Sequence, residues 1–432
     1  MNEAMLMQNE HYIISTDKKR HWVDKNNQLV PSSKYTPPNY DESTRMWRPF
    51  QLAFILMTLR SIVLDIDDAF VERDVVDLIW FPTGGGKTEA YLGLIALTII
   101  NRRKLYKERG GGVASIMRYT LRLLTMQQFQ RATLVIMALE LLRRWDENQL
   151  GLEPISIGLW VGDNSLPNSI EDLLNEFQNL IKGIRNKIPF TNCPWCSSDF
   201  RHIGGVVTDR KNNFNFGKAH LFCNNNNCSF TEPNFFTVDS SKGAIPVNLC
   251  DETIYQHPPS LLFGTVDKFA QLAHKVDGNN NQKDSRRLFG KGNWENGKPQ
   301  NGYLPPDLII QDELHLLLGP LGSAVALFEA AVDQLCTRED GTRPKIISST
   351  ATTRNTQLQI AALFGREVKL FPKPGVECDD SFFAFYKRSF NLSENIDSEY
   401  IAKRKYVGVL PTGRTQIWMQ MRLSAILMTH RV

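Results

Sequence analysis

The sequence has 432 residues, of which 42% are hydrophobic and 22% charged, and its formal net charge is +4. These values are typical of a globular protein, and a charge this small excludes any argument from composition alone for a polyanionic partner. No apolar run is long enough to cross a bilayer, and residues 1–20 lack the apolar stretch of a signal peptide, so we expect a cytoplasmic protein without a membrane partner.

The sequence predicts the following elements in chain order: a polar, mobile arm over 1–45, a helix over 50–70, a strand over 75–81, a helix over 87–100, a strand over 113–117, a helix over 123–145, and further strands over 261–264, 307–311 and 345–349. Apolar strands that alternate with long apolar helices are typical of a doubly wound parallel sheet. The alternation is interrupted near Pro167, and Asn, Cys and aromatic residues follow to about Cys250. A second polar stretch, over 277–302, is expected to be a long loop.

Residues 82–88, Pro-Thr-Gly-Gly-Gly-Lys-Thr, lie between the first predicted strand and its helix. In this setting glycines let backbone N–H groups surround phosphates, and the helix N-terminus adds partial positive charge. We expect Lys87 to reach the β- and γ-phosphates of ATP and the Thr88 hydroxyl to bind Mg²⁺. The residues expected to hold the nucleotide here are Thr83, Gly84, Gly85, Gly86, Lys87 and Thr88. The alternative is a glycine-rich turn in which the lysine occurs by chance.

A pair of acids ends the predicted strand over 307–311. Asp312 and Glu313 follow it directly, and in open α/β sheets ligands bind at the carboxyl ends of the strands. We expect Asp312 to hold Mg²⁺ through water and Glu313 to activate the water that attacks the γ-phosphate. His315 is expected to sense the nucleotide and couple it to neighbouring loops. This signal is weak alone and becomes strong beside the phosphate loop.

Two further segments fit a nucleotide site. Thr350 and Thr352 follow an apolar strand, and their hydroxyls are expected to bond the turn that carries the acids. Gln51 precedes the phosphate loop, and its two-sided amide can recognise adenine. The alternatives are a solvated turn for the threonines and an ordinary helix start for Gln51.

Four of the seven cysteines are clustered in the sequence. Cys193 and Cys196 have C-x₂-C spacing, and Cys223 and Cys228 have C-x₄-C spacing. An odd number of cysteines without a secretory signal argues against disulfides. Four thiolates at these spacings predict a closed, structural Zn²⁺ site without an open position for catalysis. Nearby basic and aromatic residues predict either a nucleic-acid-binding face or a solvated one: Arg201, Arg210, Lys211, Phe214, Phe216 and Lys218.

Residues 312–315 have the Asp-Glu-x-His form of superfamily 2 helicases, and Gln51, residues 84–88 and residues 350–352 follow the motif order of that superfamily. Longer stretches resemble the helicase subunit of the DISARM anti-phage defence system, namely 81–91, 118–132, 265–270 and 311–323. The likeness covers roughly residues 45–432. It implies an ATP-driven, DNA-binding motor that works with a partner protein and a methyltransferase in restricting phage DNA.

Two more segments resemble the nucleic-acid-contacting motifs of the superfamily by position, 119–123 and 264–269. The residues expected to contact DNA phosphates are Arg118, Thr120, Arg122, Thr265 and Lys268. The alternative is that Arg122 and Lys268 form internal salt bridges.

Motors of this superfamily have two RecA-like domains, and the second supplies arginine fingers. Because the sequence ends at Val432, soon after residues 350–352, we expect only the first domain here. A separate polypeptide would then supply the second, and the chain alone would hydrolyse ATP weakly or not at all. Other subunits of the defence system are further expected partners.

The expected fold class is α/β, a RecA-like P-loop NTPase domain with a parallel sheet, interrupted by a small Cys₄ zinc-binding insertion. The expected parts are a polar arm (1–45), the first part of the RecA-like domain (46–165), the insertion (166–250), the second part of the domain (251–365) and a C-terminal extension (366–432). The expected function is ATP hydrolysis by the ATP-binding half of a DNA helicase or translocase in a DISARM-like defence system. The alternative is a non-motor scaffold that binds ATP or DNA and recruits partners through its zinc module.

Overall fold

The computed structural model describes residues 1–16, 22–25, 28–31, 35–63, 72–81, 85–119, 122–162, 166–200, 207–208, 220–223, 225–231, 243–272, 284–291, 294–295, 298–299, 302–317, 319–350, 356–373, 375, 380–385 and 408–429. The chain divides into two compact units, Met1–Lys373 and Pro374–Val432. Among the described residues, no helix combines the length and the apolar character that crossing a bilayer requires.

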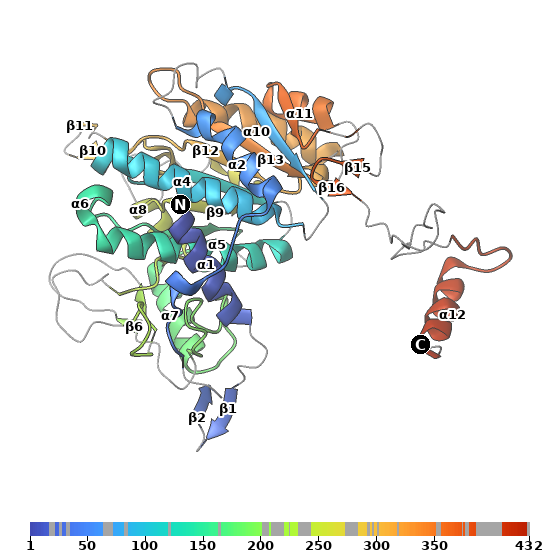
Figure 1. Ribbon diagram of the computed structural model, residues 1–432, viewed down its shortest axis with the longest axis horizontal. Coiled ribbons are helices and arrows are strands. Elements are labelled where there is room, and N and C mark those ends of the chain that lie inside the picture. Colours follow the sequence, from blue (N-terminus) through green and yellow to red (C-terminus); the bar gives the residue numbers. More distant parts are fainter. Residues whose placement is uncertain are drawn as a thin grey trace, which may run out of the picture. The chain divides into compact units, whose positions relative to one another are not determined.

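The first unit is built on one sheet of parallel strands, eight of them among the described residues (Figure 1). Their order across the sheet is β14 (Val368–Phe371), β3 (Val76–Trp80), β13 (Lys345–Thr350), β12 (Leu308–Gln311), β4 (Ser115–Tyr119), β9 (Leu261–Thr265), β5 (Ile157–Trp160) and β8 (Val247–Asn248). Strands β4, β9, β12 and β13 are buried along their whole length, as expected where helices cover both faces. The predicted α/β class is confirmed, and the five predicted strands correspond to β3, β4, β9, β12 and β13.

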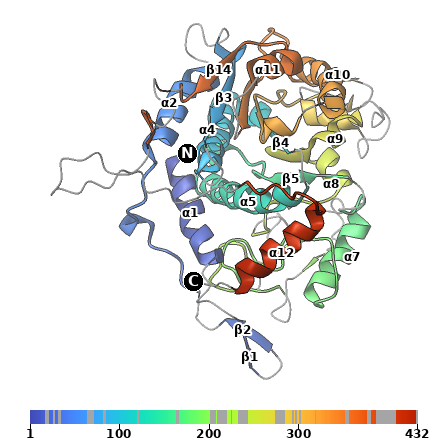
Figure 2. The same ribbon diagram turned by 90° about the vertical axis from the view of Figure 1, so that its right-hand side faces the viewer.

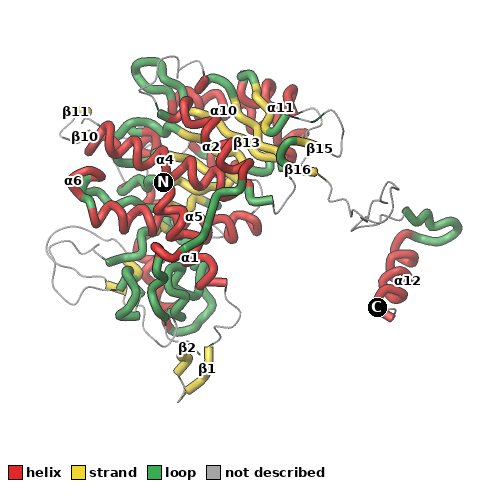
Figure 3. The backbone as a smooth tube through the Cα atoms, viewed as in Figure 1, coloured by secondary structure: helices red, strands yellow, loops and turns green. Residues whose placement is uncertain are grey.

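Helices cover both faces of this sheet (Figures 2 and 3). The chain crosses from β3 to β4 in one direction and from β12 to β13 in the other. Because such crossovers are right-handed, the connecting helices α4 (Lys87–Tyr106) and α10 (Gly319–Cys336) lie on opposite faces. Helix α5 (Arg122–Trp145) packs beside α4, and α11 (Thr356–Phe364) packs beside α10.

The strand register sets the edge where a ligand can bind. Gln311 at the end of β12 pairs with Ser348 of β13, and Thr350 at the end of β13 pairs with Trp80 of β3. The carboxyl ends of β3, β12 and β13 therefore meet at one edge of the sheet, where open parallel sheets bind their ligands.

The first unit contains further helices and strands besides helix α1 (Asn2–Thr16). They are β1 (Trp22–Lys25), β2 (Gln28–Pro31), η1 (Tyr40–Glu42), α2 (Pro49–Ile62), η2 (Lys107–Gly110), α6 (Glu147–Leu150), α7 (Ile170–Ile181), β6 (Val207–Thr208), β7 (His220–Leu221), α8 (Asp251–Gln256), α9 (Val266–Phe269), η4 (Ser285–Phe289), β10 (Trp294–Glu295), β11 (Lys298–Pro299) and η5 (Leu314–Leu316). The second unit contains the paired strands β15 (Asp380–Ser381) and β16 (Ala384–Phe385) and helix α12 (Gln416–Thr429).

The first residues of the chain are not the mobile arm that the sequence predicted. Asn2–Thr16 forms helix α1, which lies against α5 and α4 (Figure 1). Its buried side chains include Ala4, Met5, Met7 and His11. The prediction was wrong because these few apolar residues are spread among polar ones, and their burial depends on the surface that α4 and α5 offer.

Two segments differ from the predicted loop and domain boundaries. Within 277–302, the short helix η4 buries Leu288 and Phe289, so part of this polar stretch contributes to the core. Strand β14 pairs with β3 at the edge of the sheet, although the sequence placed it in the C-terminal extension. The predicted domain boundaries otherwise remain predictions.

Candidate functional site

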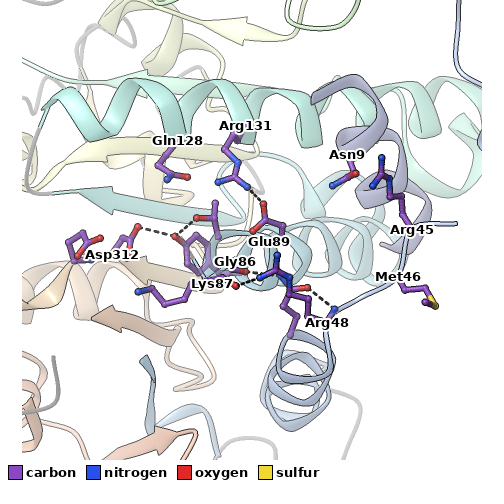
Figure 4. Close-up of a pocket in the computed structure, with 15 residues that line it drawn as sticks. Asn9, Arg45, Met46, Arg48, Gly86, Lys87, Glu89, Gln128, Arg131 and Asp312 are labelled. Carbon is purple, nitrogen blue, oxygen red and sulfur yellow. Dashed lines mark hydrogen bonds and ion pairs between the residues drawn. The ribbon is translucent and has the colours of Figure 1, made fainter. Parts of the chain in front are cut away.

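A cleft of about 480 Å³ lies at the carboxyl edge of the sheet (Figure 4). It is lined by Asn9, Arg45, Met46, Arg48, Gln51, Gly85, Gly86, Lys87, Thr88, Glu89, Tyr91, Gln128, Arg131, Asp312 and Glu313. These residues come from α1, α2 and the segment before it, the start of α4, α5 and the turn after β12. The cleft therefore brings together the phosphate-loop and acidic segments that lie far apart in the sequence.

The described part of the phosphate loop begins at Gly85, since Thr83 and Gly84 lie outside the described residues. Gly86 has a φ of 98°, and a Cβ there would lie 2.9 Å from Nε2 of Gln51, so both the conformation and the space favour glycine. The Lys87 ammonium donates a hydrogen bond of 2.6 Å to the Phe81 carbonyl, at the end of β3.

The charge of Lys87 is influenced by its surroundings in two opposite ways. Burial lowers the pKa of Lys87, while the nearby carboxylates of Asp312 and Glu313 act against this shift. The two carboxylates therefore partly offset the attraction of the Lys87 ammonium for phosphate while no nucleotide is bound.

The acidic pair follows β12 as predicted, and its second member is strained. Glu313 has φ 50° and ψ 47°, a left-handed conformation that is uncommon for a residue with a side chain and is often found at functional sites. Burial, and then repulsion from Asp312, raise the pKa of Glu313. Its Oε2 lies 3.4 Å from Nδ1 of His315, and that nitrogen lies 3.4 Å from the Thr350 hydroxyl.

A buried tyrosine that the sequence analysis did not identify connects the two halves of the site. The Tyr91 hydroxyl donates to Oδ2 of Asp312 at 2.9 Å and lies 3.1 Å from the Thr88 hydroxyl. Tyr91 follows Thr88 by three residues, so one helical turn places both hydroxyls on the same face of α4. That spacing was the available signal, and only the position of β12 shows where the face points.

Gln51 lies in the cleft with both ends of its amide bonded to backbone. Its Oε1 accepts from the Arg48 N–H at 2.9 Å, and its Nε2 donates to the Gly86 carbonyl at 2.8 Å. The first bond caps α2, which is the helix-start role considered as the alternative. The second connects α2 to the phosphate loop, so Gln51 shapes the site whether or not it also contacts a base.

The hydroxyls at the end of β13 contact the turn that carries the acids, as far as they are described. Ser349 donates to Oδ1 of Asp312, and Thr350 contacts His315. Thr352 lies outside the described residues. The roles of all these residues in nucleotide binding remain predictions.

The four predicted metal ligands form one buried cluster. The sulfur atoms of Cys193, Cys196, Cys223 and Cys228 all lie within 4.8 Å of one another. Two of the Sγ···Sγ distances are 3.9 Å (Cys193 to Cys228) and 3.4 Å (Cys196 to Cys223). A tetrahedral Zn²⁺ site with Zn–S bonds of about 2.3 Å places its sulfur atoms about 3.8 Å apart, so the cluster fits this ion.

Polar groups surround these sulfurs as a metal-thiolate site requires. The backbone N–H of Asn225 donates to Sγ of Cys223 at 3.4 Å. The Nδ2 group of Asn225 lies 3.9 Å from Sγ of Cys196, as a further donor to sulfur. Donors directed at sulfur stabilise the negative charge of metal-bound thiolates.

Helix α1 holds this cluster from the side of the nucleotide cleft. The ring of His11 stacks on Trp195, between the first two cysteines, with ring centres 3.6 Å apart. Its Nδ1 lies 2.6 Å from the Trp195 carbonyl and its Nε2 lies 2.8 Å from the Tyr40 hydroxyl. Burial lowers the pKa of His11 to about 4, so the ring is neutral near pH 7. No pattern in the sequence indicates this contact.

Two of the predicted DNA contacts, Arg118 and Lys268, are buried and already paired. Arg118 is buried and forms a two-bond ion pair with Glu329, at 2.6 and 2.9 Å. Lys268 is buried and bonds Asp251 at 2.9 Å, which is the internal salt bridge considered as the alternative. The structure therefore contradicts both as exposed phosphate ligands, because each cation already has a buried partner.

Of the other predicted DNA contacts, the structure describes the side chain of Thr265 alone. Thr265 is buried, and its hydroxyl has no hydrogen-bond partner among the described residues. Thr120 lies outside the described residues, and Arg122 begins α5 with its side chain undescribed. The basic and aromatic residues proposed around the cysteines, Arg201, Arg210, Lys211, Phe214, Phe216 and Lys218, also lie outside the described part of the chain.

The fold and the cysteine cluster define the class of this chain, a P-loop NTPase-type α/β domain with a small cysteine-bearing insertion. No protein-family model matches it. The chain is 36% identical over 427 residues to the DISARM protein DrmA of Bacillus paralicheniformis, and the match covers 88% of this chain and 35% of that protein. The resemblance to a DISARM subunit is therefore confirmed, and the chain spans about a third of the length of this curated relative.

Solved structures show a weaker likeness. The crystal structure of the DUF1998 helicase MrfA gives a TM-score of 0.38 and 13% identity, covering 77% of this chain and 31% of MrfA. The Mycobacterium smegmatis helicase Lhr bound to ssDNA and AMP-PNP gives a TM-score of 0.35 and 14% identity, covering 75% of this chain and 27% of Lhr.

Proposed function

We propose that this chain contains the ATP-binding half of an ATP-dependent DNA helicase or translocase that acts in a DISARM-like defence system. One observation carries the proposal: the cleft gathers Lys87 and Thr88 with Asp312 and Glu313 at the carboxyl edge of a parallel sheet. A lysine, a hydroxyl and two carboxylates in one cleft match the groups that bind and hydrolyse a nucleoside triphosphate with Mg²⁺. The similarity to a DISARM protein supports the biological setting.

Each of these side chains has a role that its surroundings favour. Lys87 would exchange its bond to the Phe81 carbonyl for the β- and γ-phosphates, which are stronger acceptors for an ammonium. Thr88 and Asp312 are connected through the Tyr91 hydroxyl and present hard oxygen ligands that suit Mg²⁺. Bound Mg²⁺ would neutralise phosphate charge.

Glu313 is the proposed general base, because its raised pKa makes it a better proton acceptor than an ordinary carboxylate. His315 contacts both Glu313 and Thr350, so it could report on the base to the end of β13. In two-domain motors a second RecA-like domain adds arginines to the phosphates. We therefore propose that full turnover needs such a domain, in the same polypeptide or in another.

We further propose that the cysteine cluster binds a structural Zn²⁺ ion. Its sulfur spacing supports this assignment, and four protein ligands leave no position for a substrate. Zinc quantification of the purified chain should give about one ion per chain, and Cys196→Ser together with Cys223→Ser should remove it. Protein that is folded and contains no metal would overturn the assignment.

A non-motor scaffold is the second candidate, and the burial of Arg118 and Lys268 favours it, because these expected DNA contacts are paired inside the protein. ATP turnover distinguishes the two functions. A motor should hydrolyse ATP faster when single-stranded DNA or a second motor domain is added, whereas a scaffold should bind without turnover under every condition.

The test uses purified chain and two variants, with ATP binding measured by calorimetry and hydrolysis by phosphate release. Lys87→Ala should abolish ATP binding, because it removes the ammonium that lies between the end of β3 and the Asp312–Glu313 pair. Glu313→Gln should keep binding and stop turnover. Lys104→Ala is the matched control, since Lys104 is exposed in the last turn of the same helix. ATP binding that survives in Lys87→Ala, together with turnover that survives in Glu313→Gln, would overturn the site.

A further inference from the structure

The nucleotide cleft contains an ion pair to which the sequence assigned no role. Arg131 reaches from α5 to Glu89, which lies in the first turn of α4 (Figure 4). Both side chains line the cleft beside Lys87, and both are largely shielded, with 22% and 19% of their surface exposed. A charged pair in this position acts directly on any anion that the cleft accepts.

Glu89 by itself is unfavourable for a phosphate-binding helix start. A carboxylate in the first turn stabilises the helix, because the N-terminus carries partial positive charge. The same positive charge is what attracts phosphates, so a free carboxylate there would compete with them and repel them. Its Oε2 lies 3.6 Å from the position that a Cβ of Gly86 would occupy, which places the acid beside the phosphate loop.

Arg131 is held in place from its other side by the N-terminal helix. The ring of Tyr12, on α1, lies 5.2 Å from the Arg131 guanidinium carbon, within the range of a cation–π contact. The preceding residue, His11, stacks on Trp195 and fixes the rotation of α1. The guanidinium is therefore confined between an aromatic ring and the Glu89 carboxylate.

We propose that Arg131 is a positioning residue of the nucleotide cleft, which neutralises and holds Glu89 so that this carboxylate does not repel the phosphates of ATP. The inference rests on the proposed function of the cleft. It assigns Arg131 an indirect action through Glu89, and this differs from an arginine that bonds a phosphate itself. The two actions predict opposite results when both charges are removed together.

The test is a double-mutant comparison of nucleotide affinity in the full chain. Arg131→Gln leaves Glu89 unpaired, and we expect ATP binding to weaken by about tenfold, because two like charges then share a poorly solvated cleft. ADP carries less charge and should be affected less. Glu89→Gln should bind ATP at least as tightly as the unmodified chain. The double variant Arg131→Gln/Glu89→Gln should recover affinity to within about threefold.

The matched control is Arg60→Gln, which removes the same charge from an ion pair with Glu72 at the last turn of α2, outside the residues that line the cleft, and should leave affinity unchanged. Circular dichroism and thermal melting check that each variant is folded. A double variant as weak as Arg131→Gln alone would overturn the proposal, since Arg131 would then contact the nucleotide directly. If Lys87→Ala fails to weaken ATP binding, the proposed function is wrong. If Lys87→Ala weakens binding but Arg131→Gln binds ATP as tightly as the unmodified chain, the inference about Arg131 alone is wrong.

Discussion

Strand β12 carries an aspartate at each end, and the two have opposite surroundings. Asp307, directly before the strand, is buried among three arginines. The distances are 3.3 Å to Arg73, 3.1 Å to Arg102 and 2.6 Å to Arg338. Burial by itself raises the pKa of Asp307, but Arg102, Arg338 and Arg73 outweigh it and hold the pKa below its ordinary value.

Asp312, directly after the same strand, has no ion-pair partner of this kind among the described residues. It accepts hydrogen bonds from the hydroxyls of Tyr91 and Ser349 and from the backbone N–H of Glu313, at 3.0 Å for the last. Hydroxyl and amide donors satisfy its oxygens without neutralising its charge. An acid saturated with arginines stabilises the fold, whereas an acid held by neutral donors keeps its attraction for a cation.

The largest expected effect comes from neutralising Asp307, directly before β12. Asp307→Asn leaves three buried arginines without their shared anion, so we expect a loss of about 3–5 kcal/mol in the free energy of unfolding. Urea denaturation followed by circular dichroism measures it. Asp74→Asn, which removes an exposed partner of Arg343, is the control and should cost at most about 1 kcal/mol. If the two variants are equally stable, the ion pairs between Asp307 and the three arginines do not stabilise the fold.

Neutralising Asp312, directly after β12, should change stability little and ATP affinity strongly. Asp312→Asn keeps the shape of the side chain, so stability should fall by only about 1 kcal/mol. The affinity for ATP in the presence of Mg²⁺ should fall by about 10- to 100-fold, because a ligand environment for the cation is lost. Binding measured with EDTA should change little. An equal loss with and without Mg²⁺ would contradict the assignment of Asp312 to the cation.

The smallest effect concerns pH. The pKa of Glu313 is raised, so turnover should begin to fail at a pH above about 4.3, the ordinary value for glutamate, as its carboxylate becomes protonated. The pKa of Asp307 is lowered, so its contribution to stability is present above the unfolded value of about 3.9 and is lost only as pH falls through the folded value. Mildly acidic solution should therefore slow ATP hydrolysis before the contribution of Asp307 to stability is lost. Turnover that falls only together with the Asp307 contribution in a pH titration would contradict this order.

Much of this site could be predicted from the sequence because its parts are local. An apolar run followed by Gly-Lys-Thr, and another followed by Asp-Glu, specify two parallel strands and what comes after each. The C-x₂-C and C-x₄-C pairs likewise brought four thiols together, as their spacing suggested. In these cases the chemistry lies within a few residues of the element that positions it.

The failures all involve partners that are distant in the sequence. Arg118 was expected to face DNA, yet its carboxylate partner, Glu329, lies 211 residues away on α10. Tyr91 and Arg131 were overlooked, because a tyrosine and an arginine on apolar helices have no distinctive pattern until Asp312 and Glu89 are placed beside them. The sequence predicts an arm where helix α1 lies, because the buried face of this helix is completed by α5 and by Trp195.

The sequence by itself determined the strands, the phosphate loop, the acidic turn and the cysteine pairs, because hydrophobic periodicity and ligand spacing are short-range properties of a chain. Only the tertiary structure decided which charges are neutralised and which stay open. Asp307 and Asp312 are five residues apart, one directly before and one directly after the same apolar strand, and the local sequence does not show which of them is neutralised. Their difference comes from which distant helices and loops pack against each edge of the sheet, since charge pairing depends on separation in space and on burial.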